Sequence, residues 1–244
     1  MIAGASEFVG LPAEGRRFSD QRRVRLGDVT ASGRLRLDAL ARYLQDVAGD
    51  DVADAGIDKP WVMRRLAVRL GKLPRFRDTV ELVTFCSGTG RQWAERRTDL
   101  HVDGRVAAET VSIWVYVDPD SGRPLSLEDW FFDLYGVASG GRRVTARLQL
   151  PGLSDDATPR PWPLRVTDVD VLGHVNNAAY WEAVEEEVAR CAPGRRIEHA
   201  ELEHRGAVEP GTTVELRTAQ NGSDLSTWVM QDGEVRTAAR LQLG

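Results

Sequence analysis

Hydrophobic and polar residues alternate along several short stretches of the chain, as they do in strands that bury one face. In the first half these stretches cover residues 61–70, 80–87, 92–102 and 107–117. In the second half they cover residues 197–206, 213–218, 226–231 and 235–243. The dipeptides Asp103-Gly104, Asn221-Gly222 and Asp232-Gly233 separate consecutive stretches, and such dipeptides favour the tight turns of β-hairpins. The pattern therefore predicts antiparallel strands in both halves.

Two longer segments repeat their hydrophobic residues with the period of a helix. The first covers residues 37 to about 55, and Leu37, Leu40 and Leu44 lie on its apolar face. The second covers residues 176 to about 191 and ends before Pro193-Gly194, which closes the helix. Its glutamates, at positions 182 and 185 to 187, are expected on a solvated face. Each half thus predicts one long helix beside antiparallel strands, which is an α+β fold.

The segment that leads into the second helix repeats the segment that leads into the first. When residue 25 is aligned with residue 165, identical residues coincide at Arg25/Arg165, Asp28/Asp168, Val29/Val169, Gly33/Gly173 and Ala39/Ala179. The copies differ where chemistry is expected, because Asp170, His174 and Asn176 stand in place of Thr30, Arg34 and Arg36. One scaffold is used twice, and only the second copy carries candidate acid–base groups.

The strand sequences also repeat, as TVELVT in the first half and TVELRT in the second. We therefore expect an N-terminal domain over residues 16–140 and a C-terminal domain over residues 158–244. Residues 141–157, which are rich in glycine and proline, are expected to form the connector. The connector region includes one strand-like piece, residues 144–150.

Composition narrows the class of protein. The chain is 42% hydrophobic and 28% charged, so it can bury a core and is not expected to be disordered. No apolar run approaches the roughly 20 residues that cross a bilayer, and the N-terminus lacks the pattern of a secretory signal. Two distant cysteines, Cys86 and Cys191, suit a reducing, cytoplasmic location. A net charge of −5 argues against nucleic-acid binding.

From Asp168 to Tyr180 the sequence reads Asp-x-Asp-Val-x-x-His-Val-Asn-Asn-x-x-Tyr. This run resembles the acyl-acyl carrier protein thioesterases, a family of double hotdog proteins. Further matching segments lie at residues 61–66, 87–90, 111–115 and 202–205. The resemblance covers residues 18 to 243 and implies two tandem hotdog folds, the first supplying most of an apolar acyl channel. It also implies hydrolysis of fatty acyl thioesters of acyl carrier protein, a reaction of fatty acid biosynthesis and lipid metabolism.

The sequence departs from the family pattern at three positions. The family has an Asp-x-Asn-x-His core, which Asp170 and His174 match, but Leu172 stands where the family has Asn. Ala207 and Val208 stand where the resemblance implies a later Glu-Cys pair. A catalytic cysteine at position 208 is thereby excluded. The chemistry is left to Asp170, His174 and Asn176.

Thioester hydrolysis needs an activated water and a site for the oxyanion. Asp170 or His174 could take the proton of the water, a role worth roughly 10²–10⁴ in rate. A His–Asp pair would also fix the imidazole tautomer. Backbone N–H groups near the start of the second helix favour a negative oxygen, and Gly173 permits close approach of a carbonyl. We therefore predict Asp170, His174 and Asn176 as catalytic residues. Gly173, Val175, Asn177 and Tyr180 are predicted to bind substrate.

Structural roles compete with these assignments. Asp168 is interpreted mainly as a turn residue, and Asp170 has the same alternative. Asn176 could simply cap the helix. Asn177 could support the fold, and Tyr180 could belong to the core or line an acyl tunnel. His199, Glu201 and Glu203 alternate along one strand, but a solvated face is the default, so neither a metal nor a cofactor is expected.

Other functions remain open at this stage. An acyl-CoA thioesterase would use the same site, so the partner is acyl carrier protein or CoA. A non-catalytic acyl-binding module is favoured by Leu172, Ala207 and Val208. A hotdog hydratase and a cysteine nucleophile are less well supported. Neither nucleic acid nor a membrane span is expected, and a homodimer is an open alternative.

Overall fold

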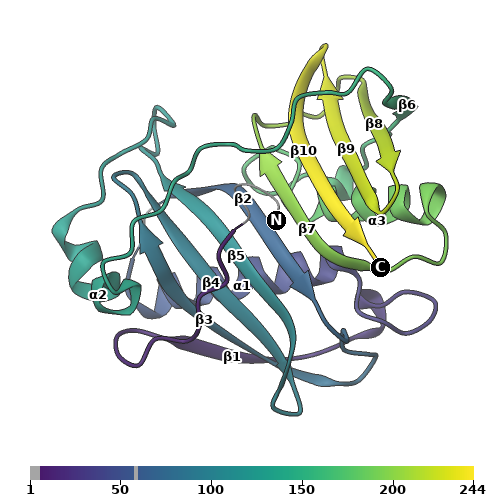
Figure 1. Cartoon of the computed structure of the whole chain (residues 1–244). Coiled ribbons are helices and arrows are strands. Elements are labelled where there is room, and N and C mark those ends of the chain that lie inside the picture. The colour runs from purple at the N-terminus through teal and green to yellow at the C-terminus, as the bar shows by residue number, and fades with distance from the viewer. Residues whose placement is uncertain (1–5, 58–59) are drawn as a thin grey trace. The chain divides into compact units, whose positions relative to one another are not determined.

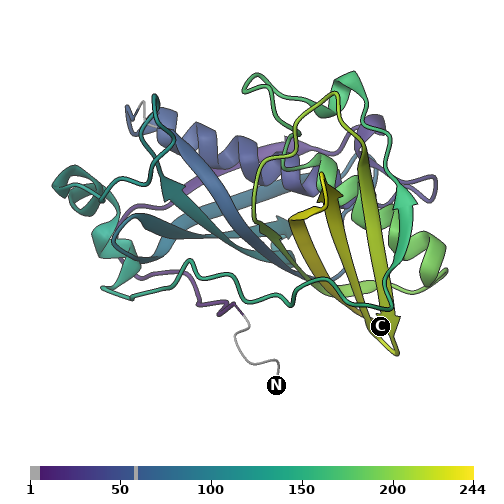
Figure 2. The ribbon, with the colours of Figure 1, turned by 90° about the horizontal axis from the view of Figure 1, so that it is seen from above.

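The computed structural model describes residues 6–57 and 60–244, which divide into two compact units (Figures 1 and 2). Unit 1 comprises Met1–Leu35 and Arg42–Arg147, apart from the residues outside the described ranges. Unit 2 comprises Arg36–Ala41 and Leu148–Gly244. The long helix α1 (Leu37–Asp54) therefore contributes its beginning to unit 2 and the rest to unit 1.

Unit 1 is built on an antiparallel sheet whose strands follow the order β1, β3, β4, β5, β2. These strands are β1 (Phe18–Arg23), β2 (Trp61–Leu70), β3 (Thr79–Thr89), β4 (Trp93–Val102) and β5 (Arg105–Tyr116). Helix α1 runs along one face of this sheet (Figure 2). A short 3-10 helix, η1 (Leu26–Asp28), precedes α1, and helix α2 (Asp129–Ser139) follows β5.

Unit 2 repeats this plan in smaller form, with strands in the order β7, β10, β9, β8, β6. They are β6 (Thr158–Pro161), β7 (Ile197–His204), β8 (Val214–Asn221), β9 (Asp224–Gln231) and β10 (Glu234–Leu243). Its helices are η2 (Val166–Asp168) and α3 (Ala179–Cys191). The α+β class predicted from the sequence is confirmed.

The hairpins form where the sequence places them. Asp103 and Asp232 have φ of 49° and 53°, and the glycines that follow them also have positive φ. Two successive residues with positive φ are what the primed hairpin turns require. The turn dipeptides therefore fix the register of β4 with β5 and of β9 with β10.

Two expectations about elements are wrong, and one helix was missed. Helix α3 begins at Ala179 rather than at residue 176, because Asn176 Oδ1 accepts the N–H of Ala178 at 2.9 Å and forms a turn instead. Helix α2 was not predicted. Residues 144–150 form no strand, and the carboxylate of Glu203 accepts the N–H groups of Gln149 at 2.5 Å and Leu150 at 3.0 Å.

Three glutamates expected on solvated faces are buried. Glu201 on β7 is 6% exposed, and the other two, Glu203 and Glu187, form several polar contacts. Glu203 on β7 is 0% exposed and binds the connector as just described. Glu187 on α3 is also 0% exposed, and it pairs with Arg160 Nε at 2.7 Å and Arg190 Nη2 at 2.6 Å. Thr218 donates a further hydrogen bond to Glu187 at 2.6 Å. The carboxylates of Glu203 and Glu187 are both compensated, which is the condition for burying a charge.

Candidate active site

The predicted catalytic residues lie on one turn of unit 2, between η2 and α3. Asp168 is buried and closes η2, because its carboxylate accepts the N–H of Arg165 at 2.8 Å and pairs with Arg165 Nη2 at 2.6 Å. Arg165 also contacts Glu182 on α3. The interpretation of Asp168 as a turn residue is confirmed.

A tight turn joins Asp170 to His174. The N–H of Asp170 donates to the carbonyl of His174 at 3.0 Å, and the N–H of Gly173 donates back to the carbonyl of Asp170 at 3.0 Å. Gly173 has φ of 78°, a left-handed conformation that other residues adopt only with strain. A bridge between Val169 and Val175 closes the turn at its base.

The turn brings the side chains of Asp170 and Asn176 together. Asp170 Oδ1 accepts the N–H of Leu172 at 2.9 Å, and Asp170 Oδ2 accepts a hydrogen bond from Asn176 Nδ2 at 3.1 Å. Asn176 is itself held, since its Oδ1 accepts the N–H of Ala178. Both carboxylate oxygens of the half-buried Asp170 are therefore fixed in direction.

The imidazole of His174 is exposed and stands apart from this network. Among the described residues, no hydrogen bond or ion pair joins its ring to Asp170 or to any other side chain. The contact between His174 and Asp170 is made by the backbone alone. A preformed His–Asp side-chain pair is therefore not seen, whereas an Asp–Asn pair is.

Most backbone N–H groups of this turn are already used. Those of Val175 and Asn176 donate to the carbonyls of Val208 at 3.1 Å and Asp168 at 2.8 Å. In the part of the chain that the structure describes, the N–H groups of His174 and Asn177 have no acceptor. Asn177 lies just before α3, where such unpaired donors point outward and the helix field favours an anion.

The positions of the family's Glu-Cys pair lie beside this turn. Val208 accepts the N–H of Val175 at 3.1 Å and is 0% exposed, while Ala207 is exposed. Neither side chain can supply a proton or a nucleophile. Asp170, His174 and Asn176 therefore remain the acid–base candidates of the turn.

Two of the predicted substrate-binding residues lie in the core of unit 2. Val175 and Tyr180 are 5% and 2% exposed. The Tyr180 ring packs against Trp162 and His204, with centroids 5.7 and 5.1 Å away. Burial raises the pKa of Tyr180 to about 12, so its hydroxyl stays protonated. Gly173 is exposed, and Asn177 is half-buried. Contact of these residues with substrate stays a prediction.

Neither cysteine has the character of a nucleophile. Both are free thiols, and burial raises the pKa of Cys86 to about 11 and that of Cys191 above its usual range. A nucleophilic cysteine needs the opposite shift. Within residues 6–57 and 60–244, no group of three or more His, Cys, Asp or Glu side chains is arranged to hold a metal ion.

Unit 1 contains an apolar cavity of about 280 Å³ under helix α1. Its aromatic walls are Trp61, Trp114, Phe131 and Tyr135, and small residues of α1, Ala48 and Gly49, leave the space open. A cavity of this kind fits the expectation that the first half supplies an apolar channel. The contribution of α2 to it, through Phe131 and Tyr135, was missed with the helix. The spacing of these two aromatic residues by four positions was the available signal.

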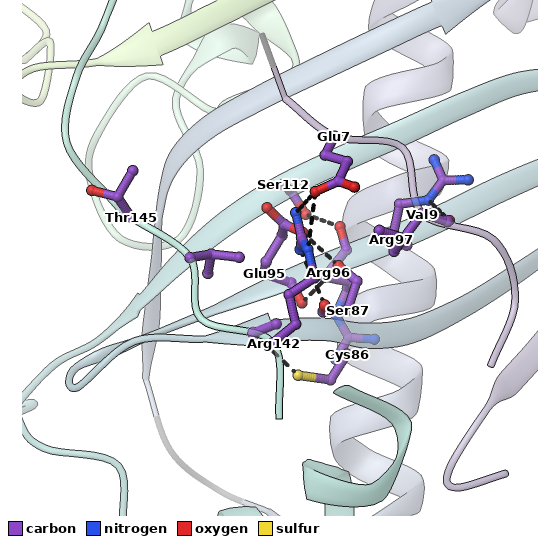
Figure 3. Close-up of polar contacts among 12 residues, drawn as sticks. Glu7, Val9, Cys86, Ser87, Glu95, Arg96, Arg97, Ser112, Arg142 and Thr145 are labelled. Carbon is purple, nitrogen blue, oxygen red and sulfur yellow. Dashed lines mark hydrogen bonds and ion pairs between the residues drawn. The ribbon is translucent and has the colours of Figure 1, made fainter. Parts of the chain in front are cut away.

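Polar groups near this cavity are mostly paired with one another. Asp51 on α1 is 1% exposed and binds Arg16 Nε and Arg96 Nη1, both at 2.8 Å, and it accepts a hydrogen bond from Tyr135 at 3.1 Å. The carboxylate of Glu95 accepts a hydrogen bond from Ser87 Oγ at 2.8 Å and also contacts the guanidinium of Arg142 (Figure 3). Arg142 binds the carboxylate of Glu7 as well. These ion pairs tie the N-terminal segment and the connector to the sheet of unit 1.

Models of two domain families match the chain. The acyl-ACP thioesterase N-terminal domain matches residues 15–135, and the acyl-ACP thioesterase C-terminal domain matches residues 153–242. The chain belongs to the acyl-ACP thioesterase family. This acyl-ACP thioesterase family member is accordingly a thiolester hydrolase, which confirms the enzyme class expected from the sequence.

Several relatives of this family member match most of its length. An uncharacterised Mycobacterium tuberculosis protein is 27% identical over 238 residues, covering 96% of this chain and 95% of its own. The solved acyl-ACP thioesterase of Bacteroides thetaiotaomicron has a TM-score of 0.82 at 19% identity and covers 93% of this chain and 98% of its own. The 12:0-ACP thioesterase of Umbellularia californica has a TM-score of 0.79 at 22% identity, with 97% and 99% covered.

These structural matches confirm the tandem hotdog fold predicted from the resemblance. No helix among the described residues is long and apolar enough to cross a membrane.

Proposed function

We propose that this thiolester hydrolase releases free fatty acids from acyl carrier protein, and that His174 and Asp170 assist the attack of water. Its family membership supports acyl carrier protein as the carrier, and two similar solved structures are those of ACP thioesterases. The single observation that carries the mechanism is the turn itself. It carries an exposed imidazole, which has no hydrogen-bond partner among the described residues, and a carboxylate that is fixed by two hydrogen bonds.

His174 is the proton carrier in this proposal. Its exposed ring takes a proton from water while the water oxygen forms a bond to the thioester carbonyl carbon. The carbonyl electron pair moves onto oxygen and gives a tetrahedral oxyanion. When that intermediate collapses, the C–S bond breaks and its electron pair leaves with sulfur. The imidazolium then returns the proton to the thiolate, so the products are a carboxylic acid and a thiol.

Asp170 and Asn176 support this proton transfer from fixed positions. The Asp170 carboxylate sits on the same turn as His174 and stabilises the imidazolium that forms. Asn176 directs that carboxylate through its hydrogen bond and is a positioning residue in this scheme. The N–H groups of His174 and Asn177, which have no acceptor among the described residues, are the proposed donors to the oxyanion.

The acyl chain is assigned to the cavity of unit 1. A cavity of about 280 Å³ lies at the small end of the roughly 300–1,000 Å³ range of ligand pockets. We therefore expect medium-length chains to fill the cavity. The domain boundaries of this proposal are 16–140 and 158–244, joined by 141–157. The two free thiols support a cytoplasmic location, and a homodimer stays a prediction.

A comparison of carriers tests this function. Matched acyl chains would be presented on acyl carrier protein and on CoA, and thiol release would be measured with the purified full chain. We expect a higher kcat/KM on acyl carrier protein, with a maximum at medium chain length. A higher kcat/KM on CoA would assign the protein to the acyl-CoA thioesterases instead. No thiol release from either carrier would refute the proposal.

A further inference from the structure

One charged side chain lines the apolar cavity of unit 1 with part of its surface open. Arg96 lies on β4, and its side chain is 12% exposed. It shares the cavity wall with Cys86, Ala94 and Trp114, which present no strong hydrogen-bonding partner to it. The Trp114 N–H is already donated to Ser112 Oγ at 2.8 Å. Glu95 also lines the cavity, but its carboxylate is buried and already bound to Ser87 and Arg142. Arg96 is therefore the main charged group of the wall that is open to a ligand.

Within the described ranges, only one of the three guanidinium nitrogens of Arg96 has a partner. Nη1 pairs with Asp51 Oδ2 at 2.8 Å and donates to Thr84 Oγ1 at 3.1 Å. Among the described residues, the structure gives no acceptor for Nε or Nη2. A guanidinium has five N–H donors, so those on Nε and Nη2 remain available to a ligand. A hydrocarbon chain would leave these donors unsatisfied, which disfavours it relative to a chain that carries an acceptor.

The charge balance around Arg96 selects a neutral acceptor. The positive charge of Arg96 already faces the Asp51 carboxylate, which also binds Arg16 and Tyr135. A ligand carboxylate at this place would be brought close to Asp51, and like charges repel strongly where water is scarce. A hydroxyl or keto oxygen accepts the same hydrogen bonds without that repulsion.

The amide of Gln45 is a second polar group on the cavity wall that favours a ligand with an oxygen substituent. Gln45 lies on α1 and lines the cavity, and its Oε1 is buried without a hydrogen-bond partner among the described residues. A ligand hydroxyl could satisfy an amide as well as a guanidinium, since a hydroxyl both donates and accepts. A keto oxygen could only accept.

We propose that the cavity of unit 1 binds acyl chains with a neutral oxygen substituent, a hydroxyl or a keto group, that accepts hydrogen bonds from Arg96. This inference rests on the proposed function for its acyl ligand and deepens it by naming the substrate class. The chain length is the medium length that fits the cavity. The oxygen lies on the chain beyond the thioester carbonyl.

Direct binding tests this assignment without requiring catalysis. Dissociation constants of the full chain would be measured by calorimetry for decanoic acid, for hydroxydecanoic acids with the hydroxyl at successive carbons, and for the matching oxodecanoic acids. We expect at least one hydroxy or oxo isomer to bind about tenfold or more tightly than decanoic acid, the size of a hydrogen bond to a charged group. Equal or weaker binding of every substituted acid would overturn the proposal.

Paired variants separate the proposed contact of Arg96 with the ligand from its ion pair with Asp51. Arg96→Met should abolish the preference for substituted acids, and Arg96→Lys should do the same while keeping a charge beside Asp51. Arg16→Met removes another partner of Asp51 that does not line the cavity, so it should keep the preference. A preference that survives in both Arg96 variants would also overturn the proposal.

The two proposals can fail independently. Tighter binding of substituted acids with no thiol release from any thioester would refute only the proposed hydrolysis. Thiol release from plain and substituted thioesters with equal kcat/KM, together with equal acid binding, would refute only the role of Arg96. Preference for the hydroxy over the oxo isomers would bring Gln45 into the site as the second partner.

Discussion

The two copies of the turn share their backbone but differ in which amide groups are left unpaired. In each copy the first turn residue, Thr30 or Asp170, donates its N–H to the carbonyl four residues later, at 2.8 and 3.0 Å. The glycine three residues later, Gly33 or Gly173, donates back at 2.8 and 3.0 Å, with φ of 81° and 78°. The duplication inferred from identical residues is therefore a duplication of hydrogen bonds.

The first copy satisfies two donors whose counterparts in the second copy have no acceptor in the described part of the chain. The N–H of Arg34, which matches His174, donates to Thr30 Oγ1 at 3.3 Å. The N–H of Leu37, which matches Asn177, donates to the Glu185 carboxylate at 2.7 Å. The same hydrogen-bonded turn therefore has two different uses. Satisfied donors stabilise the first copy, whereas the donors without acceptors in the second copy are available to a ligand.

Replacement of His174 is expected to give the largest difference in kcat between variants of the two turns. His174→Ala should lower kcat by at least about tenfold and up to about 10⁴-fold, because it removes the proposed proton carrier. Steady-state thiol release measures the effect, and circular dichroism checks the fold. The matching change in the first copy, Arg34→Ala, should leave kcat unchanged. Equal effects of the two variants would mean that the second turn has no special chemistry.

A smaller effect is expected at Asn176. Asn176→Asp keeps the acceptor for the Ala178 N–H but replaces the donor to Asp170 with a second carboxylate. We expect about a tenfold loss of kcat with KM little changed. The acid limb of the pH–rate profile should move to higher pH, because adjacent carboxylates raise the pKa of one of them. An unchanged profile would show that the Asp170 carboxylate takes no part in the rate. Arg36→Ala in the first copy is the control.

The two glycines test whether the turns are equally strained. Gly173→Ala and Gly33→Ala each force an alanine into a left-handed conformation, so each should lower the free energy of unfolding by about 1 to 2 kcal/mol. Urea denaturation measures both. Only Gly173→Ala should also reduce kcat, by a few-fold, since it displaces His174. A much smaller loss at Gly33 would show that the first turn relaxes more readily than the second.

The smallest effect is expected at the cysteines. Cys86→Ala and Cys191→Ala should each retain kcat within about twofold, because burial raises the pKa of both thiols and neither is a nucleophile. Labelling with iodoacetamide at pH 8 should leave thiol release unimpaired in the unmodified protein. A large loss of kcat in either variant would reopen the cysteine mechanism.

Regular elements could be predicted because their periodicity is carried by consecutive residues. Strand β2 matches its expected bounds, and α1 ends one residue before the expected position. Helix α2 was not predicted because Asp129–Ser139 is short and contains Gly136 among its aromatic residues. The start of α3 was misplaced because one side-chain hydrogen bond, from the N–H of Ala178 to Asn176, decided it.

The site was only partly predictable for a related reason. Candidate residues such as Asp170 and His174 stand close together in sequence, so a motif could find them. The partner of Asp170 could not be read from spacing, because both His174 and Asn176 lie within reach, and the structure joins Asp170 to Asn176. The cavity was even harder to predict from the sequence, because residues from α1, four strands and α2 line it. Arg96 belongs to that set.

The carboxylate of Glu185, which lies on α3 and accepts the N–H of Leu37 at the start of α1, limits how the first copy could be engineered. A designer who wished to install a second reactive centre in the first copy could not do so by grafting Asp, His and Asn onto positions 30, 34 and 36 alone. The anion already seated there would repel a developing oxyanion, so Glu185 would have to be neutralised first.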